Sequence, residues 1–90
     1  MEYIITFKNT NNAIKAEQGL LKKELKVGVL PLPSQISAGC GISLRISPDE
    51  IKPALVALAD MNIVEIGLFL RKNENGQLVY TEIKDEERMK

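Results

Sequence analysis

Three short segments of the chain predict strands. Residues 3–8 read YIITFK, where two sets of side chains alternate, and residues 42–47 read ISLRIS, where every second residue is apolar. This period of two predicts strands that are buried on one face. A third strand is predicted over residues 27–32. Pro31 and the following Pro33 would restrict it to the edge of a sheet, because proline lacks the N–H that a central strand donates.

A helical pattern follows the first of these strands. Either Thr10 or Asn11 is placed to cap the helix N-terminus with a side-chain oxygen. Lysines gather toward the other end of the segment, where the helix dipole is negative. The pattern predicts an amphipathic helix of about four turns. Its apolar positions recur three or four residues apart, at Ala13, Ile14, Ala16, Leu20, Leu21 and Leu25.

A second helix is predicted to begin in the segment SPDE at residues 47–50. Serine followed by glutamate three residues later forms a capping box, and proline suits the first helical position. Pro53 removes one helical hydrogen bond, so we expect the first turn to be distorted or the regular helix to begin late. The buried stripe is expected at Ile51, Ala54, Leu55, Leu58 and Met61.

Two further strands are predicted over residues 63–72 and 78–83, joined by a hairpin turn at Asn75-Gly76. The order strand, helix, strand, strand, helix, strand favours the α+β class. We expect a ferredoxin-like two-layer sandwich (βαββαβ), with the last hairpin strand as an addition. In that topology the loop after the first strand (9–12) and the loop after the second (34–41) lie at the same end of the sheet.

The length of 90 residues predicts one α+β domain over residues 1–83. Residues 84–90 are charged apart from Met89, and we expect a frayed or partly helical tail. Twelve basic and twelve acidic residues cancel, which argues against a nucleic-acid partner. A domain this small is of modest stability, and self-association into a homo-oligomer would help it.

The chain holds one cysteine and no histidine. It therefore cannot form an intrachain disulfide, and it lacks the ligand set for a structural zinc or an iron–sulfur cluster. No phosphate-binding loop or dinucleotide fingerprint is present, so no cofactor is expected. No apolar segment approaches the ~18 residues that cross a bilayer, and the N-terminus lacks the features of a signal peptide. We expect no membrane association and a cytoplasmic location.

The single cysteine, Cys40, lies between Gly39 and Gly41 in the loop that precedes the third strand. A cysteine in a glycine-flanked loop is expected to be accessible, whereas structural cysteines are mostly buried. If the loops meet as the topology predicts, Cys40 faces the N-terminus of the first helix. The positive end of a helix dipole lowers a cysteine pKa, so a thiolate or persulfide would be stabilised there.

The residues predicted to support the sulfur come from three segments. Thr10 and Asn11 belong to the helix start, and Ser37 is a hydrogen-bonding residue of the cysteine loop. Gly39 and Gly41 would let successive N–H groups turn toward the sulfur and form an anion nest, and Arg45 and Lys8 are the nearest basic residues in sequence. The alternative is a small cysteine packed under its own loop and chemically inert.

Together, several of these segments resemble the small bacterial domains of unknown function described as selenium/sulfur carrier-like proteins. The resemblance covers about residues 3 to 70, and its most specific part is the proline pair followed by the Ser-x-x-Cys-Gly step. The matching residues are Thr6-Phe7, then Thr10, Ala13 and Glu17, then Leu30-Pro31-Leu32-Pro33, Ile36-Ser37, Cys40-Gly41 and Leu44-Arg45.

The resemblance implies a cytoplasmic bacterial protein in which Cys40 carries sulfur or selenium as a persulfide or selenosulfide. The atom would pass from a donor, such as a cysteine desulfurase, to an acceptor enzyme. Carriers of the sulfurtransferase-A type differ, because their cysteine precedes a Pro-x-Pro signature, whereas Cys40 precedes Gly41 and Ile42.

Two other functions compete with the carrier hypothesis. In a noncatalytic interaction or regulatory module, the sheet would dimerise through an edge or an open face, and Cys40 would only occupy a tight turn. In a small-ligand sensor, the loops around Thr10 and Cys40 would bind the ligand and the protein would be stabilised by it. A carrier loses its function in the Cys40→Ser variant, whereas an interaction module tolerates this change.

Overall fold

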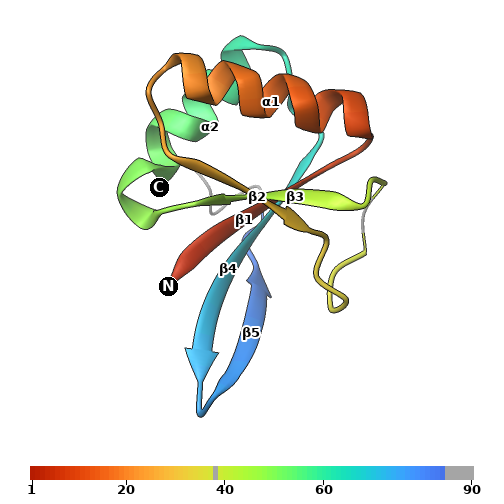
Figure 1. Cartoon of the computed structure of the whole chain (residues 1–90), viewed down its shortest axis with the longest axis vertical. Coiled ribbons are helices and arrows are strands. Elements are labelled where there is room, and N and C mark those ends of the chain that lie inside the picture. The colour runs from red at the N-terminus through yellow and green to blue at the C-terminus, as the bar shows by residue number, and fades with distance from the viewer. Residues whose placement is uncertain (38, 85–90) are drawn as a thin grey trace.

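A computed structural model describes residues 1–37 and 39–84. Its elements alternate along the chain much as the hydrophobic pattern predicts (Figure 1). They are β1 (Glu2–Phe7), α1 (Thr10–Lys22), β2 (Val27–Pro31), β3 (Ile42–Ile46), a 3₁₀ turn (Pro48–Glu50), α2 (Ile51–Asp60), β4 (Ile66–Glu74) and β5 (Gln77–Glu82).

The strands of the described chain form one antiparallel sheet in the order β2-β3-β1-β4-β5. The first four strands have the order of a ferredoxin-like sandwich, and β5 extends the sheet beyond β4. The predicted fold class is therefore confirmed. Strand β2 lies at one edge, as its prolines predict, and its last residue is Pro31.

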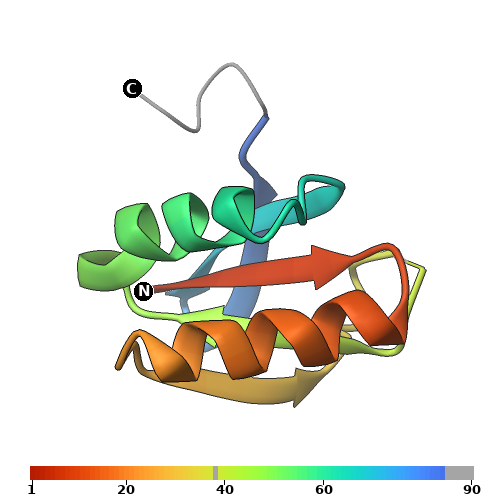
Figure 2. The ribbon, with the colours of Figure 1, turned by 90° about the horizontal axis from the view of Figure 1, so that it is seen from above.

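Both helices cover the same face of the sheet, which we call the helix face (Figure 2). The core lies between the helices and this face. Because successive strand residues point to opposite faces, each central strand contributes every second side chain. The fully or nearly fully buried residues of this core include Ile5, Phe7, Ala16, Leu20, Leu44, Ile46, Ala54, Leu58 and Leu68.

The opposite face of the sheet, which we call the helix-free face, is buried only at its centre. Ile4 and Ser43 are fully buried and Thr6 is 4% exposed, although no helix covers them. Figure 1 shows the loop between β2 and β3 descending to this side of the sheet. Ile36 is a buried residue of that loop, and like Ile4 it does not belong to the helix-face core.

The structure differs from the prediction at the start of both helices. The side chain of Asn9, not of Thr10 or Asn11, caps α1 and accepts a hydrogen bond from the backbone N–H of Asn12 at 2.8 Å. Ser47 makes no side-chain capping bond, so the predicted capping box does not form. Glu50 instead accepts a hydrogen bond from the backbone N–H of Lys26 at 3.1 Å, which ties the start of α2 to the segment before β2.

The regular helix begins late, as Pro53 predicts, but the predicted loss of a helical hydrogen bond does not occur. A 3₁₀ turn precedes α2, and the regular helix begins at Ile51, so Pro53 lies in the first turn. The N–H groups of a first turn have no partner within the helix, and the missing proline N–H therefore costs no helical bond there.

The hairpin turn between β4 and β5 also follows the prediction. Asn75 and Gly76 both have positive φ, 53° and 83°, as a two-residue type I′ turn requires. Strand β4 begins at Ile66, three residues later than predicted. The predicted tail falls mostly on residues 85–90, which lie outside the described part of the chain, and Lys84 is exposed. In that part, neither helix is long and apolar enough to cross a membrane.

Candidate functional site

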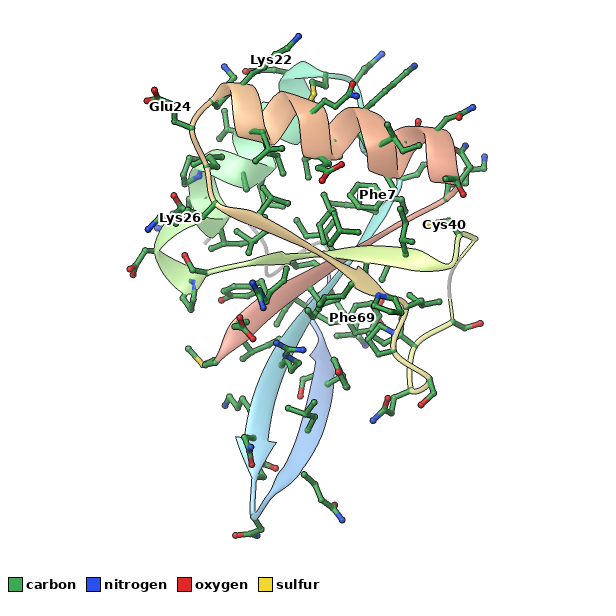
Figure 3. The ribbon with its side chains drawn as sticks, in the orientation of Figure 1. Phe7, Lys22, Glu24, Lys26, Cys40 and Phe69 are labelled. Atoms are coloured by element: carbon green, nitrogen blue, oxygen red, sulfur yellow. The ribbon has the colours of Figure 1, made fainter. Side chains whose placement is uncertain are left out.

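Cys40 lies two residues before the start of β3, at the end of the sheet where α1 begins (Figure 3). The turn after β1 and the loop after β2 share this end, as the topology predicts. The β2–β3 loop is closed at its base because the backbone N–H of Leu32 donates to the carbonyl of Gly41 at 2.8 Å. Within the loop, the N–H of Ile36 donates to the carbonyl of Pro33 at 3.0 Å.

The thiol of Cys40 is buried, contrary to the accessible position predicted for it. Only 7% of the residue is exposed, and it belongs to the helix-face core together with Phe7 and Ala13. The sulfur donates a hydrogen bond to the carbonyl oxygen of Ile42 at 3.2 Å. The glycines on either side are exposed, but the side chain turns under α1, where a small polarisable group fills an apolar space.

The two flanking glycines play different parts. A β-carbon at Gly39 would lie 1.9 Å from the carbonyl oxygen of Lys8, so glycine is needed for the loop to pack against the end of β1. A β-carbon at Gly41 would meet no atom within 4 Å, and this residue does not have a positive φ. Gly41 therefore lacks the left-handed conformation with which an αR–αL nest turns N–H groups toward an anion.

The helix start does not contribute the side chains that were predicted. Thr10 and Asn11 are exposed, and the capping role belongs to Asn9. The hydrogen bond described for the sulfur goes to an acceptor, the carbonyl of Ile42, and this suits a protonated thiol. The structure brings Cys40 to the end of the sheet where α1 begins, but it shows no bond between the sulfur and a donor from the described helix start.

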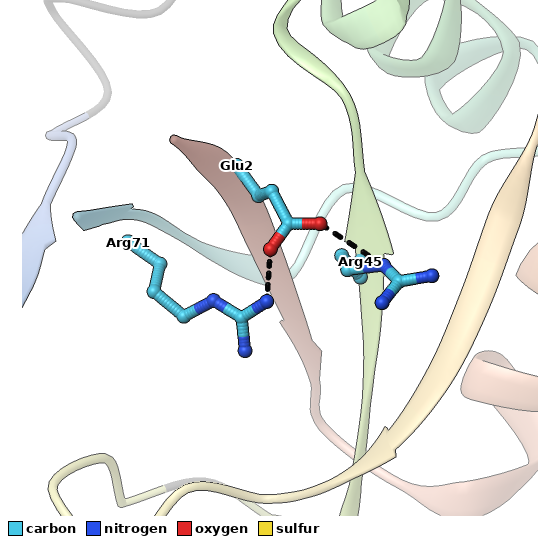
Figure 4. Close-up of polar contacts among 3 residues, drawn as sticks. All are labelled: Glu2, Arg45 and Arg71. Carbon is cyan, nitrogen blue, oxygen red and sulfur yellow. Dashed lines mark hydrogen bonds and ion pairs between the residues drawn. The ribbon is translucent and has the colours of Figure 1, made fainter. Parts of the chain in front are cut away.

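The basic residues are paired elsewhere. Arg45 lies on the helix-free face, and its Nε is 3.2 Å from a carboxylate oxygen of Glu2 (Figure 4). Arg71 donates to the other oxygen of Glu2, and this hydrogen bond raises the pKa of Arg71. Lys8 forms an exposed pair with Glu65 at 3.2 Å. Neither Arg45 nor Lys8 therefore contacts the thiol in this structure.

An open cleft of about 480 Å³ lies next to the cysteine loop. Ser37 and Gly39 form part of its wall, and Thr6 and Gly67 lie at its base as a cross-strand pair of β1 and β4. Cys40 does not line the cleft, although it is the next residue after Gly39. Sequence reasoning missed this feature because its base depends on the register between two strands far apart in the chain, which no local pattern encodes.

No group of three histidine, cysteine, aspartate or glutamate side chains that could hold a metal ion is found in residues 1–37 and 39–84. The sulfur-containing group of this site is the Cys40 thiol, which donates its hydrogen bond to the Ile42 carbonyl.

Comparison with known proteins gives a match to a family model. No curated protein and no solved structure matches the chain. Residues 2–69 match the family model described as "Putative Se/S carrier protein-like", so the chain belongs to this family.

Proposed function

We propose that the protein carries sulfur or selenium on Cys40, as a persulfide or selenosulfide, between a donor protein and an acceptor enzyme. Membership of the selenium/sulfur carrier-like family is the observation that carries this proposal. Cys40 falls within the matched residues and is the only cysteine in the chain. A single thiol suits a relay in which the next sulfur belongs to another protein, in a reducing compartment such as the bacterial cytoplasm.

The transfer needs no oxidant and no cofactor. The thiolate of Cys40 attacks the terminal sulfur of a donor persulfide and forms a new S–S bond. The S–S bond within the donor breaks, and the donor cysteine leaves as a thiolate that takes up a proton. The acceptor reverses these roles, because its nucleophile takes the terminal sulfur and Cys40 is released as a thiolate. Selenium would pass in the same way as the terminal atom of a selenosulfide.

Burial of the thiol sets a requirement for this transfer. With 7% of Cys40 exposed and its proton on the Ile42 carbonyl, the sulfur must turn outward or its neighbours must move before a donor can reach it. A bulkier persulfide would also fill the space beneath α1 more tightly. A loaded protein is therefore expected to differ in conformation around Cys40 from the unloaded one.

The test combines thiol alkylation and sulfur loading, both followed by intact mass. One sample of the native protein is alkylated over a range of pH, and a separate, unalkylated sample is incubated with a cysteine desulfurase and cysteine. We expect a gain of one sulfur atom that a thiol reductant removes and that the Cys40→Ser variant does not show. If the native protein gains no sulfur, while the same thiol is alkylated rapidly in denaturant, Cys40 is not a sulfur acceptor from this donor class and the proposal fails.

The burial of Cys40 favours the interaction module as the second candidate. In that case the thiol is a core residue, and Cys40→Ser, which keeps a hydrogen-bond donor for Ile42, would leave any partner binding intact. The same variant would abolish sulfur transfer by a carrier. Loss of transfer with unchanged thermal stability in Cys40→Ser therefore supports the carrier. A native protein that accepts no sulfur, with a variant that keeps its stability and partner binding, would support the interaction module.

A further inference from the structure

The hydroxyl of Thr6 is the starting point for a second site. Thr6 is 4% exposed and lines the cleft beside the cysteine loop, yet its side chain makes no hydrogen bond within the described part of the chain. Every fully buried polar side-chain atom of the described residues has a hydrogen-bond partner. Because the Thr6 hydroxyl oxygen has none, it is not fully buried and keeps some contact with solvent. A buried hydroxyl at the base of an open cleft can bond to a ligand that enters it.

Gly67 keeps this hydroxyl accessible. A β-carbon at position 67 would lie 2.3 Å from the Thr6 hydroxyl oxygen and 3.1 Å from a ring carbon of Phe69. Glycine therefore leaves open the space above the hydroxyl, and the ring of Phe69 stands beside it. The base of the cleft therefore consists of the Thr6 hydroxyl, which can donate and accept a hydrogen bond, next to the aromatic ring of Phe69.

One end of this base carries an ion pair, and the other end carries a carboxylate. Lys8 and Glu65 form their exposed pair at one end, beyond the last rung of β1 and β4. At the other end, Glu82 is the cross-strand partner of Phe69. All of these residues line the same cleft.

The register places Thr6 midway between the two ends. Thr6 is two residues from Lys8 along β1, and its partner Gly67 is two residues from Phe69 along β4. At ~3.3 Å per residue, this four-residue separation corresponds to about 13 Å along the strands, and Glu82 on β5 also lies two strands away from Lys8, about 10 Å across the sheet. The two backbone positions are therefore about 16 Å apart, a distance that an extended tripeptide of ~10 Å and the reach of the Lys8 and Glu82 side chains together span.

We propose that this cleft binds a short zwitterionic peptide of about three residues. The ligand ammonium would lie between Glu82 and the Phe69 ring, the ligand carboxylate would pair with Lys8, and a central amide would bond to the Thr6 hydroxyl. This site goes beyond the proposed carrier function because it does not use the Cys40 thiol. Its wall includes Gly39, so the bound peptide lies one residue from the cysteine.

The test is an NMR titration of the full chain with triglycine, together with its N-acetylated and C-amidated forms. We expect saturable shifts of the Gly39 and Gly67 amide signals with the unblocked peptide and affinity about tenfold weaker with each blocked form, as the loss of one charged contact predicts. The Cys40→Ser variant should bind triglycine as the native protein does, which separates this result from the test of sulfur transfer.

Two variants examine the ends and the base of the cleft. Glu82→Gln should weaken triglycine about fivefold without changing the affinity for the N-acetylated form, and Glu74→Gln, an exposed carboxylate of the same hairpin outside the cleft, should have no effect. Thr6→Val should weaken all three peptides equally. No saturable shift with triglycine, or equal binding of the blocked and unblocked forms by the native protein, would overturn the proposal.

Discussion

The two faces of the sheet bury their central side chains in different ways. The helix face is covered by α1 and α2 and holds a continuous apolar core, into which Cys40 is drawn from its loop. The helix-free face has no such cover, and it combines buried Ile4 and Thr6 with the Glu2 ion pairs and an open cleft. Stability is therefore expected to reside on the helix face, and ligand recognition on the helix-free face.

The largest expected effect is on the helix face. Leu68 is 2% exposed in the centre of its core, so Leu68→Ala should lower the free energy of unfolding by about 3 kcal/mol through lost burial and a residual cavity. Leu78 on the projecting hairpin is 48% exposed, and Leu78→Ala should change it by less than about 0.5 kcal/mol. Urea unfolding measures both values. Equal losses of unfolding free energy would show that Leu78 on the hairpin is packed as tightly as a core residue.

The junction between the faces gives the second prediction. Gly39→Ala places a methyl group against the Lys8 carbonyl and should destabilise the protein by about 2 kcal/mol, because backbone must move. The same movement should increase the rate of Cys40 alkylation. Gly41→Ala is the matched control, since nothing lies near its β-carbon, and it should be neutral or slightly stabilising. Unchanged alkylation in Gly39→Ala would mean that the loop does not keep the thiol buried.

The Glu2 carboxylate tests how much an ion pair contributes on the helix-free face. Glu2→Gln weakens the contacts with Arg71 and Arg45 and should cost about 1.5 kcal/mol, since the Arg71 side chain is 16% exposed. The pair of Lys8 and Glu65 is exposed at both partners, and Lys8→Gln should cost less than about 0.5 kcal/mol. Chemical unfolding in low salt measures the difference, and equal costs would contradict it.

The pH dependence of the same contact follows from the raised pKa of Arg71. A cation whose pKa is raised on folding contributes stability below its unfolded pKa, and this contribution is lost only as the pH rises through the higher folded pKa. Arg71 is therefore charged in both states near neutrality. The part of the unfolding free energy lost in Glu2→Gln that is due to Arg71 should therefore be the same at about pH 6 and about pH 9.

Local sequence patterns predict most of the fold because each strand and helix has a strong period of its own. The alternation in residues 42–47, the Asn75-Gly76 turn and the two edge prolines each determine a feature that depends on near neighbours. Their order along the chain then suffices for the sheet topology, since few arrangements bury two helices on one face of such a sheet.

The candidate site is harder to predict because it depends on side-chain direction and register. A glycine-flanked loop indicates an accessible cysteine, but whether the side chain turns outward depends on the space that α1 leaves above β3. The pairing of Thr6 with Gly67 depends on how β1 and β4 align. Neither side-chain direction nor strand register has a local sequence signature. The sequence therefore predicts where Cys40 lies in the fold, but not that its side chain is buried.

The helix start decides which residue organises the site end of α1, and its predicted loss of stability is smaller than those at Leu68, Gly39 and Glu2. Thr10 and Asn11 were placed there by residue type, whereas the structure gives the cap to Asn9, which bonds to the N–H of Asn12. Asn9→Ala should destabilise the protein by about 1 kcal/mol by leaving this N–H without its side-chain partner. Thr10→Ala, at an exposed first-turn position, should change thermal stability little. A larger loss of stability from Thr10→Ala than from Asn9→Ala would show that Thr10 caps the helix. It would also support the prediction that Thr10 acts on the environment of Cys40.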